Sequence, residues 1–332
     1  MTTELASQAM KGLLPLVQFA LGPPKREPAA IALRHALTER SWSVRLVESV
    51  AESADNGQVA VMAHAIVPAL RQALAQLAAQ QRRLDVLLEL GLAHAAPAVR
   101  AAGAPCALMK GSAAIAWVYP ESAWRQRRDL DLLVGERLPE VRRALLARGW
   151  EDANDPRLGQ DPHHVRAWNM SVTLGGGRVS LDLHRHLVHS PWCRPDVDLM
   201  LASRVEGRAA LPVTAPADTI INTAIHLIGT GFHEPLKGWL DLLRLLPLVS
   251  PVELRARARA HELVTGTWTC LGVLGRWFDA PVAEHRAALG RPLLGPLLDH
   301  LAAGEHATPE RRPLPRGVAY RLWPRLLKDL RL

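Results

Sequence analysis

The pattern of hydrophobic residues changes twice along the chain, and these changes mark three regions. From residue 27 to about residue 102, leucine, valine and alanine recur every three or four positions, as at Leu70, Leu74 and Leu77, which predicts amphipathic helices. Short apolar runs then alternate with short helical patterns, and helical spacing returns after Pro191. We therefore expect an N-terminal helical region over 1–102, a domain with a mixed sheet over 103–190 and a C-terminal helical region over 191–332.

The central region contains the expected strands. A short apolar run covers 106–109, and apolar runs without helical spacing predict strands at 130–134, 165–174 and 178–188. Helices are predicted between them at 112–118 and 138–148. Three consecutive glycines, Gly175 to Gly177, separate the last two strands and predict a hairpin, because glycine tolerates a positive φ. In the C-terminal region, helical spacing predicts helices at 218–227, 238–248, 251–263 and 266–278.

The length and composition are those of a globular protein with a full core. The chain has 332 residues, 48% of them hydrophobic, which is enough for two or three domains of ordinary size. The longest apolar stretches, 13–21 and 240–249, are shorter than the roughly 18 residues of a membrane span, so we expect no transmembrane helix. Lys11 interrupts the apolar N-terminal segment, which argues against a signal peptide. The three cysteines are widely spaced and form no CxxC pair, which favours a reducing compartment and a cytoplasmic location.

The chain is basic, with a formal net charge of +8 from 40 basic and 32 acidic residues. A polyanionic partner such as a nucleic acid is one explanation. Only five of the basic residues are lysines, however, and an excess of arginine and alanine also arises from genomic base composition alone. Residues 311–332 carry seven basic residues against one acid, Asp329, so this segment either contacts an anionic surface or is solvated or packed on another domain.

Two aspartates one residue apart, Asp129 and Asp131, belong to an apolar strand in which carboxylates are rarely found. Residues at i and i+2 project from the same face of a strand, so their oxygens can converge on one divalent ion. Asp182 is a third aspartate, in another predicted strand. Mg²⁺ prefers hard oxygen ligands, and nucleotidyl transfer uses two ions about 3.5–4 Å apart that carboxylates bridge. The three aspartates therefore predict metal-assisted phosphate chemistry.

A Gly-Ser turn precedes the aspartates and is suited to a triphosphate. Gly111 lets the backbone approach a phosphate closely, and the helix after it offers unpaired N–H groups and a positive dipole end. Ser112 can donate its hydroxyl, and Lys110 can neutralise one phosphate charge. Arg125 lies just before the acidic strand, and we expect its guanidinium to reach a phosphate or one of the aspartates.

Five motifs follow one another in a fixed order: Lys-Gly-Ser at 110–112, Tyr-Pro at 119–120, arginine at 125, Asp-Leu-Asp-Leu-Leu-Val at 129–134 and Ser-Leu-Asp-Leu-His at 180–184. In this order and spacing the chain resembles the bacterial uncharacterised nucleotidyltransferase family of the DNA polymerase β-like superfamily. The resemblance covers about residues 60–250. Arg185 stands where the family frequently has an aromatic residue.

The resemblance implies an α+β fold, with a small mixed β-sheet nucleotidyltransferase core flanked by helical regions. It also implies a nucleoside triphosphate substrate and two Mg²⁺ ions, with Mn²⁺ as an alternative. Gly111 and Ser112 would hold the triphosphate, and Asp129 and Asp131 would bind metal. Asp182 would ligate the second metal and help to deprotonate the acceptor.

Histidines near the third aspartate leave two interpretations open. His184 and His186 share a strand face with Asp182, so with other histidines nearby they are candidates for a transition-metal site. Alternatively, His184 orients Asp182 through a hydrogen bond, as outer groups fix metal ligands in other proteins. In the C-terminal region, His226 and Asp241 either line the acceptor side of the site or are a core histidine and a helix-surface acid.

The sequence thus favours a cytoplasmic, Mg²⁺-dependent enzyme that transfers a nucleoside monophosphate from an NTP to a hydroxyl or amine of an acceptor. The acceptor is left open among small molecules, peptides, proteins and RNA. One rival interpretation is a non-catalytic nucleotide-binding or protein-binding accessory factor. A second is an RNA-directed nucleotidyltransferase or toxin, which the positive charge permits. No Walker A, GxGxxG, HExxH or GxSxG motif with suitable flanks favours another enzyme class.

Overall fold

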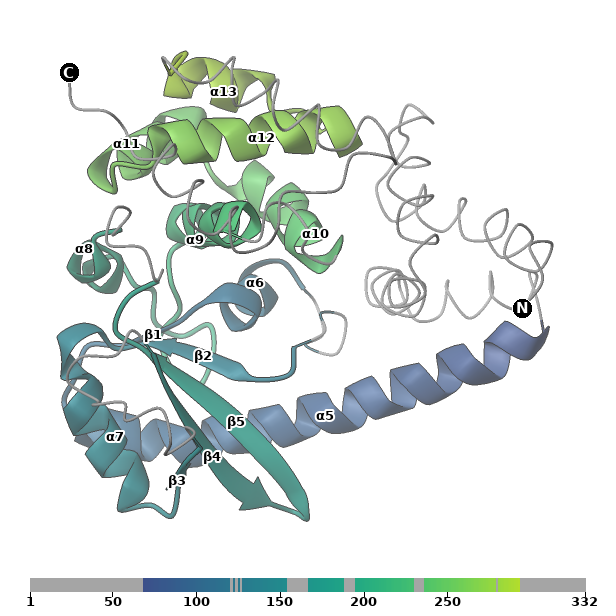
Figure 1. The fold of residues 1–332 in the computed structure, drawn as a ribbon, viewed down its shortest axis with the longest axis vertical. Coiled ribbons are helices and arrows are strands. Elements are labelled where there is room, and N and C mark those ends of the chain that lie inside the picture. Colours follow the sequence, from purple (N-terminus) through teal and green to yellow (C-terminus); the bar gives the residue numbers. More distant parts are fainter. Residues whose placement is uncertain are drawn as a thin grey trace.

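The computed structural model of the chain describes residues 68–119, 122, 125, 127–153, 167–187, 195–229, 236–278 and 280–292. At its centre lies a five-stranded mixed sheet with helices against both faces (Figure 1). This arrangement confirms the predicted α+β class. The helical pattern before residue 68 and the basic segment 311–332 lie outside the described residues.

Five strands form the sheet: β1 (Ala107–Leu108), β2 (Leu130–Leu133), β3 (Glu151–Asp152), β4 (Ala167–Leu174) and β5 (Gly177–His184). Their spatial order is β1-β2-β5-β4-β3. β2 and β5 run parallel, and every other neighbouring pair of these strands is antiparallel. The three predicted strands are confirmed, although β5 ends at His184 before the predicted limit, and the apolar run 106–109 contains β1. β3 is a short polar strand that the apolar pattern does not predict.

The glycine turn sets the register of the longest strand pair. Gly175 and Gly176 have φ of +54° and +78°, a left-handed conformation that favours glycine, and they join β4 to β5 in the predicted hairpin. The two strands pair in one register from the turn to their far ends. This register places Asn169 of β4 opposite Asp182 of β5.

The alternation of side chains gives the sheet one apolar face and a second face, called the polar face below, that carries the acidic residues together with apolar residues such as Leu133. Alternate residues of β2 and β5 are leucines in a single buried core: Leu130, Leu132, Leu181 and Leu183. The residues between them, which include Asp131 and Asp182, point to the opposite face. The predicted strand alternation is therefore what separates the polar residues from the core.

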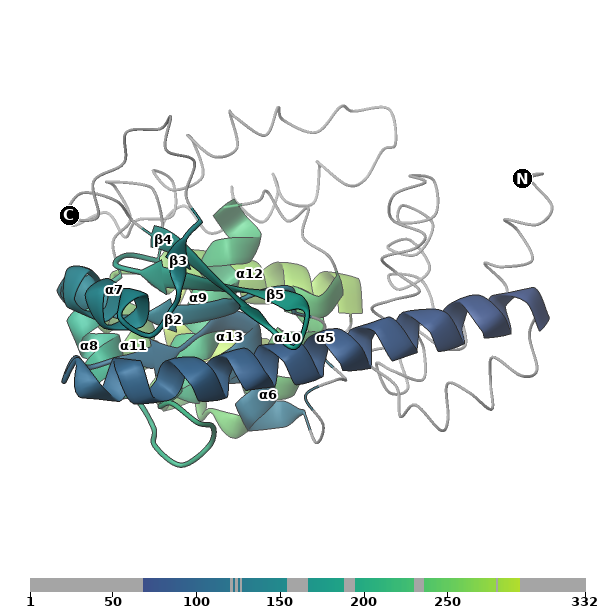
Figure 2. The ribbon, with the colours of Figure 1, turned by 90° about the horizontal axis from the view of Figure 1, so that it is seen from below.

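Helices α5 (Pro68–Ala101) and α7 (Leu138–Leu146) cover the apolar face. α5 is one continuous helix of 34 residues that runs along the sheet (Figure 2). Buried residues of both helices share a core with the strand leucines, among them Leu88, Leu92, Val99 and Val141. The predicted N-terminal helical layer is thus confirmed over residues 68–101. None of the described helices, α5 included, is long and apolar enough to cross a membrane.

The other helices lie on the side of the sheet opposite α5 (Figure 1). They are α6 (Lys110–Val118), α8 (Val197–Ala202), α9 (Pro216–Gly229), α10 (Leu236–Leu245), α11 (Pro251–Ala260), α12 (Val264–Phe278) and α13 (Ala283–Leu289). Two short 3₁₀ helices, η2 (Gly135–Arg137) and η4 (Leu246–Leu248), precede α7 and follow α10. A second core joins Leu133 of β2 to α9, α10 and α12. The four helices predicted in the C-terminal region are confirmed, and α8 and α13 are additional.

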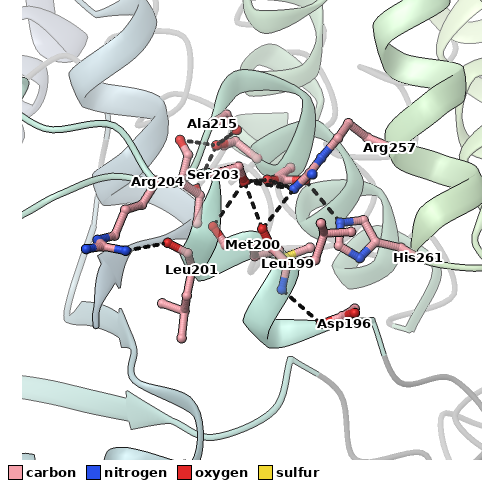
Figure 3. Close-up of polar contacts among 12 residues, drawn as sticks. Asp196, Leu199, Met200, Leu201, Ser203, Arg204, Ala215, Arg257 and His261 are labelled. Atoms are coloured by element: carbon pink, nitrogen blue, oxygen red, sulfur yellow. Dashed lines mark hydrogen bonds and ion pairs between the residues drawn. The ribbon is translucent and has the colours of Figure 1, made fainter. Parts of the chain in front are cut away.

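A buried aspartate connects three of the C-terminal helices. Asp218, in the first turn of α9, accepts hydrogen bonds from Ser203 Oγ (2.7 Å), Arg257 Nε (2.8 Å) and His261 Nε2 (3.1 Å). Figure 3 shows Ser203, Arg257 and His261 converging on one point. Burial raises the pKa of Asp218, but these hydrogen bonds outweigh burial and hold the pKa below its usual value. The cluster therefore fixes α9 relative to α11 and to the end of α8.

Gly91 lets α5 approach β5 closely. A Cβ at this position would lie 2.5 Å from Cγ1 of Val179, and a valine cannot easily turn away because it is branched at Cβ. We expect Gly91→Ala to lower the free energy of unfolding by about 1–3 kcal/mol in urea denaturation, through overpacking. Gly229→Ala is the matched control, since nothing lies within 4 Å of its added Cβ. Equal stability of the two variants would contradict the close contact.

Candidate functional site

Two aspartates of the polar sheet face lie side by side. β2 and β5 are parallel, and their register pairs Asp131 with Asp182. Asp131 is 6% exposed, whereas Asp182 is half-buried. Paired strands lie about 5 Å apart, so the two carboxylates are within reach of one common ligand. The sheet alone thus brings together two of the three predicted aspartates.

Two donors contact the buried carboxylate of Asp131. Nε2 of His184 lies 2.8 Å from Oδ1 of Asp131, and Nζ of Lys110 lies 2.5 Å from the same oxygen. Lys110 reaches this point because β1 pairs with β2, and the N–H of Met109 donates to the main-chain carbonyl of Asp131 at 3.1 Å. The sequence suggested that His184 orients Asp182. The hydrogen bond that the structure shows goes instead to Asp131, the neighbour across the sheet.

β4 supplies another polar residue, Asn169, that the motifs do not single out. Its Nδ2 donates to Oδ1 of Asp182 and lies 3.1 Å from Oγ of Ser180. The signal for this residue is the hairpin, because counting back from the glycine turn places Asn169 opposite Asp182. Asn169 therefore holds the orientation of the Asp182 carboxylate.

The pKa values of the three aspartates differ. Burial raises the pKa of Asp131, but the charge of Lys110 and the hydrogen bonds to this carboxylate outweigh burial and hold the pKa well below its usual range. Burial and the charge of Asp131 raise the pKa of Asp182 to about 6. Burial and the charge of Asp131 also raise the pKa of Asp129. The site therefore contains a firmly ionised carboxylate beside one that gains a proton more readily.

The donor set fits a divalent cation. One ligand atom each from Asp131, Asp182 and His184 lies within 4.8 Å of the other two. Carboxylates this close repel each other, as the raised pKa of Asp182 reflects, and a cation between them would remove that repulsion. The imidazole of His184 fits either as a third ligand or as the group that orients Asp131.

Asp129, predicted as a metal ligand, lies outside this group of three. It is half-buried and precedes β2, two residues before Asp131. Its pKa responds to Asp131 and to Lys237 in the first turn of α10, so it faces both the acidic pair and the C-terminal region. Its role as a metal ligand stays a prediction.

The predicted phosphate-binding turn begins α6. Gly111 and Ser112 lie in the first turn of this helix, and both are buried. A Cβ on Gly111 would lie 3.3 Å from Nη1 of Arg125, so the absent side chain makes room for this guanidinium. Oγ of Ser112 accepts a hydrogen bond from Arg127 at 3.3 Å and keeps its own proton to donate. The glycine thus has a packing role in addition to any contact with phosphate.

Arg125 is held by the C-terminal region. Its guanidinium pairs with both oxygens of Asp241 on α10, with Nη2 2.7 Å from Oδ2 and Nε 2.9 Å from Oδ1. The hydroxyl of Tyr119 donates to the same carboxylate at 2.8 Å. All three side chains are buried. Asp241 is therefore not an acid of the helix surface, whereas the interpretation that this region lines the acceptor side stays a prediction.

Arg127 is held from the other side by α5. Its Nη2 donates to Oδ1 of Asp85 at 3.1 Å and also pairs with Glu89, and Ser122 donates to Asp85. Arg127 and Asp85 are both buried. Arg125 and Arg127, which precede β2, are therefore held by α10 and by α5 respectively. No local spacing rule identifies these acids, because Arg127 lies about 40 residues further along the chain.

Two other histidines that the sequence offers as candidates, His186 and His226, are not part of the group formed by Asp131, Asp182 and His184. His186 is half-buried just after β5, and His226 is exposed on α9. Neither contributes a ligand atom to the group of Asp131, Asp182 and His184. Within the described part of the chain, a histidine-rich transition-metal site therefore finds no support.

Comparison with known protein families agrees with this geometry. Residues 43–279 match the family described as "Uncharacterised nucleotidyltransferase". The chain belongs to this family. The match covers more than two thirds of this nucleotidyltransferase-family protein and includes every described strand. The family implies a nucleoside triphosphate substrate. No curated protein matches the chain.

The buried pair of Arg125 and Asp241 predicts a stability effect in this nucleotidyltransferase-family protein. Asp241→Ala leaves a guanidinium buried without its counter-ion, so we expect the free energy of unfolding to fall by about 3–5 kcal/mol in urea denaturation. Glu140→Gln removes an exposed pair with Arg137 and should cost about 1 kcal/mol or less. If both variants lost equally little stability, the Arg125 pair would not be a buried one.

The raised pKa of Asp182 predicts a pH dependence of stability in the metal-free protein. An unfolded aspartate has a pKa of about 3.9, and that of folded Asp182 is about 6. The folded state therefore binds more protons between these values, and this contribution to stability is lost as the pH rises through them. We expect the difference in melting temperature between wild type and Asp182→Asn to shrink or reverse from pH 4 to pH 6. A constant difference would show that Asp182 titrates normally.

Proposed function

We propose that this protein is a divalent-metal-dependent nucleotidyltransferase. It would move a nucleoside monophosphate from an NTP to a hydroxyl or amine of an acceptor and release pyrophosphate. The observation that carries the proposal is the side-by-side register of Asp131 and Asp182, next to the start of α6, in a chain of the nucleotidyltransferase family. A metal site of another kind has no need for a phosphate-binding helix start beside it.

Two Mg²⁺ ions, or Mn²⁺ in their place, are the proposed cofactors. Asp129, Asp131 and Asp182 would hold them, because carboxylate oxygens are the ligands that Mg²⁺ prefers. When bound, such ions stabilise charge on the attacking and leaving oxygens of the transfer. His184 keeps Asp131 in one orientation through its 2.8 Å contact, and Asn169 does the same for Asp182.

Asp182 is the proposed proton acceptor. Asn169 holds the carboxylate of Asp182 in one orientation, and an ionised carboxylate at that position can take the proton of an attacking hydroxyl. Its partly buried position leaves one side open to an acceptor.

Lys110, Gly111 and Ser112 are the proposed contacts of the triphosphate. The first N–H groups of α6 have no partners within the helix, and they carry the positive end of its dipole. Ser112 has a hydroxyl proton to donate, and the side chain of Lys110 is 25% exposed. Arg125 would act from behind Gly111, where its buried pair with Asp241 holds the turn in place.

The acceptor and location are proposed only by class. Small molecules, peptides, proteins and RNA all carry hydroxyls or amines, so we propose the acceptor among them. The free buried thiols of Cys106 and Cys270 support a reducing compartment, and we propose the cytoplasm.

Label transfer tests the proposed activity. The wild type is incubated with each of the four NTPs, labelled at the α-phosphate, with Mg²⁺ or Mn²⁺ and with small-molecule, protein or RNA fractions of a cell lysate. We expect transfer into one fraction. Asp131→Asn and Asp182→Asn should lower it by about 10²- to 10⁴-fold, because each removes a carboxylate that the reaction needs.

Glu140→Gln, an exposed carboxylate on α7, is the control and should transfer label at the wild-type rate. Unfolding midpoints of all variants separate lost chemistry from lost folding. If the wild type bound NTP and metal but labelled no fraction, the accessory-factor interpretation would replace the proposal. If labelling were confined to RNA, the RNA-directed interpretation would be selected.

A further inference from the structure

We propose that Lys110 is the resident cation of the acidic cluster in the metal-free protein, and that it competes with the divalent ion for Asp131. When the metal binds, the ammonium leaves Asp131 and pairs with the phosphates of the incoming NTP. The inference rests on the proposed function and adds a regulatory step to it. Binding of the metal would then increase the affinity for the nucleotide, and binding of the nucleotide would increase the affinity for the metal, because the metal releases the lysine that the nucleotide needs.

The contact itself is the first observation. Nζ of Lys110 lies 2.5 Å from Oδ1 of Asp131, the most buried of the three carboxylates in this cluster. Oδ1 already accepts a hydrogen bond from His184 at 2.8 Å, so this oxygen is saturated in the metal-free state. A divalent ion on Asp131 and an ammonium at the same carboxylate would repel each other across a few ångströms of poorly screened space. The two cations therefore compete for Asp131.

The backbone holds Lys110 at this position. Its φ is +50°, a left-handed conformation that residues with a side chain rarely adopt, and Glu262 is the only other such residue in the described part of the chain. Just before it, the N–H of Met109 is bonded to the main-chain carbonyl of Asp131. Unusual backbone conformations persist where the surrounding structure fixes them, often at functional sites. The strand pairing thus places the backbone of Lys110 close to Asp131.

The charges in the cluster explain what Lys110 does in the metal-free protein. Lys110 lowers the pKa of Asp129, Asp131 and Asp182 alike, so one ammonium compensates three carboxylates. Its side chain is 25% exposed, which leaves the flexible stem room to move toward solvent and a bound nucleotide. Lys237, in the first turn of α10, lowers the pKa of Asp129. Lys237→Met removes one positive charge near the cluster and keeps Lys110 itself, so it is the matched control.

The test measures Mn²⁺ binding without turnover, by electron paramagnetic resonance of free Mn²⁺ in titrations of the full chain. Without nucleotide, we expect Lys110→Met to bind Mn²⁺ about tenfold more tightly than the wild type, a coupling of ordinary size. Lys237→Met should change the affinity by less than about threefold. Lys110→Arg keeps the cation and should remain near the wild type, and it serves as the reference if Lys110→Met is poorly folded.

A second titration measures the affinity for the nucleotide. In the presence of Mn²⁺, Lys110→Met should bind a non-hydrolysable NTP analogue about tenfold more weakly, the opposite direction to its effect on metal. Unchanged or weaker Mn²⁺ binding by Lys110→Met would overturn the proposal, as would equal tightening by both lysine variants. The outcome is separate from that of the transfer assay: a protein that exchanges Lys110 for Mn²⁺ but transfers no label retains this inference and loses the proposed function.

Discussion

The parallel pairing of β2 with β5 is the constraint on which the site depends. A shift of one position would turn Asp182 toward α5 and bring a leucine beside Asp131. Leu181 and Leu183 oppose that shift, because both are buried in the core that α5 and the sheet share. The alternation that buries leucines on one face therefore fixes the carboxylates on the other. Hydrophobic burial thus supports a polar arrangement whose members repel each other.

Two buried arginines that precede β2 are also held in place by ion pairs. Arg125 is bound to Asp241 on the C-terminal side, and Arg127 to Asp85 on α5. Buried ion pairs often contribute little net stability compared with apolar residues of the same size, yet losing one partner is costly. Their effect is therefore mainly geometric. They connect helices from both flanking regions to the loop that ends at Asp129.

Much of the fold follows from local patterns, whereas the partners within the site do not. The buried strand around Asp131, the glycine hairpin and the C-terminal helices follow from side-chain period and turn chemistry. β3 escapes such prediction because it is two exposed polar residues long and pairs through its backbone. The partner of Arg125 escapes it as well, since Asp241 lies 116 residues away and no spacing rule joins them. Asn169, by contrast, is predictable from the sequence, because the register of the hairpin places it opposite Asp182.

The structure also separates cations that the sequence could only group together. Arginine carries a planar fork with several donors, which Arg125 uses for a bidentate buried pair with Asp241, and Arg127 for separate bonds to Asp85, Glu89 and Ser112. Lysine carries a compact charge on a flexible stem, and Lys110 holds the carboxylate at the centre of the acidic cluster while remaining partly exposed. A side chain that exchanges one partner for another during a reaction must be long and flexible and must not depend on one fixed geometry. Among these residues Lys110 meets that requirement, whereas Arg125 and Arg127 have structural roles.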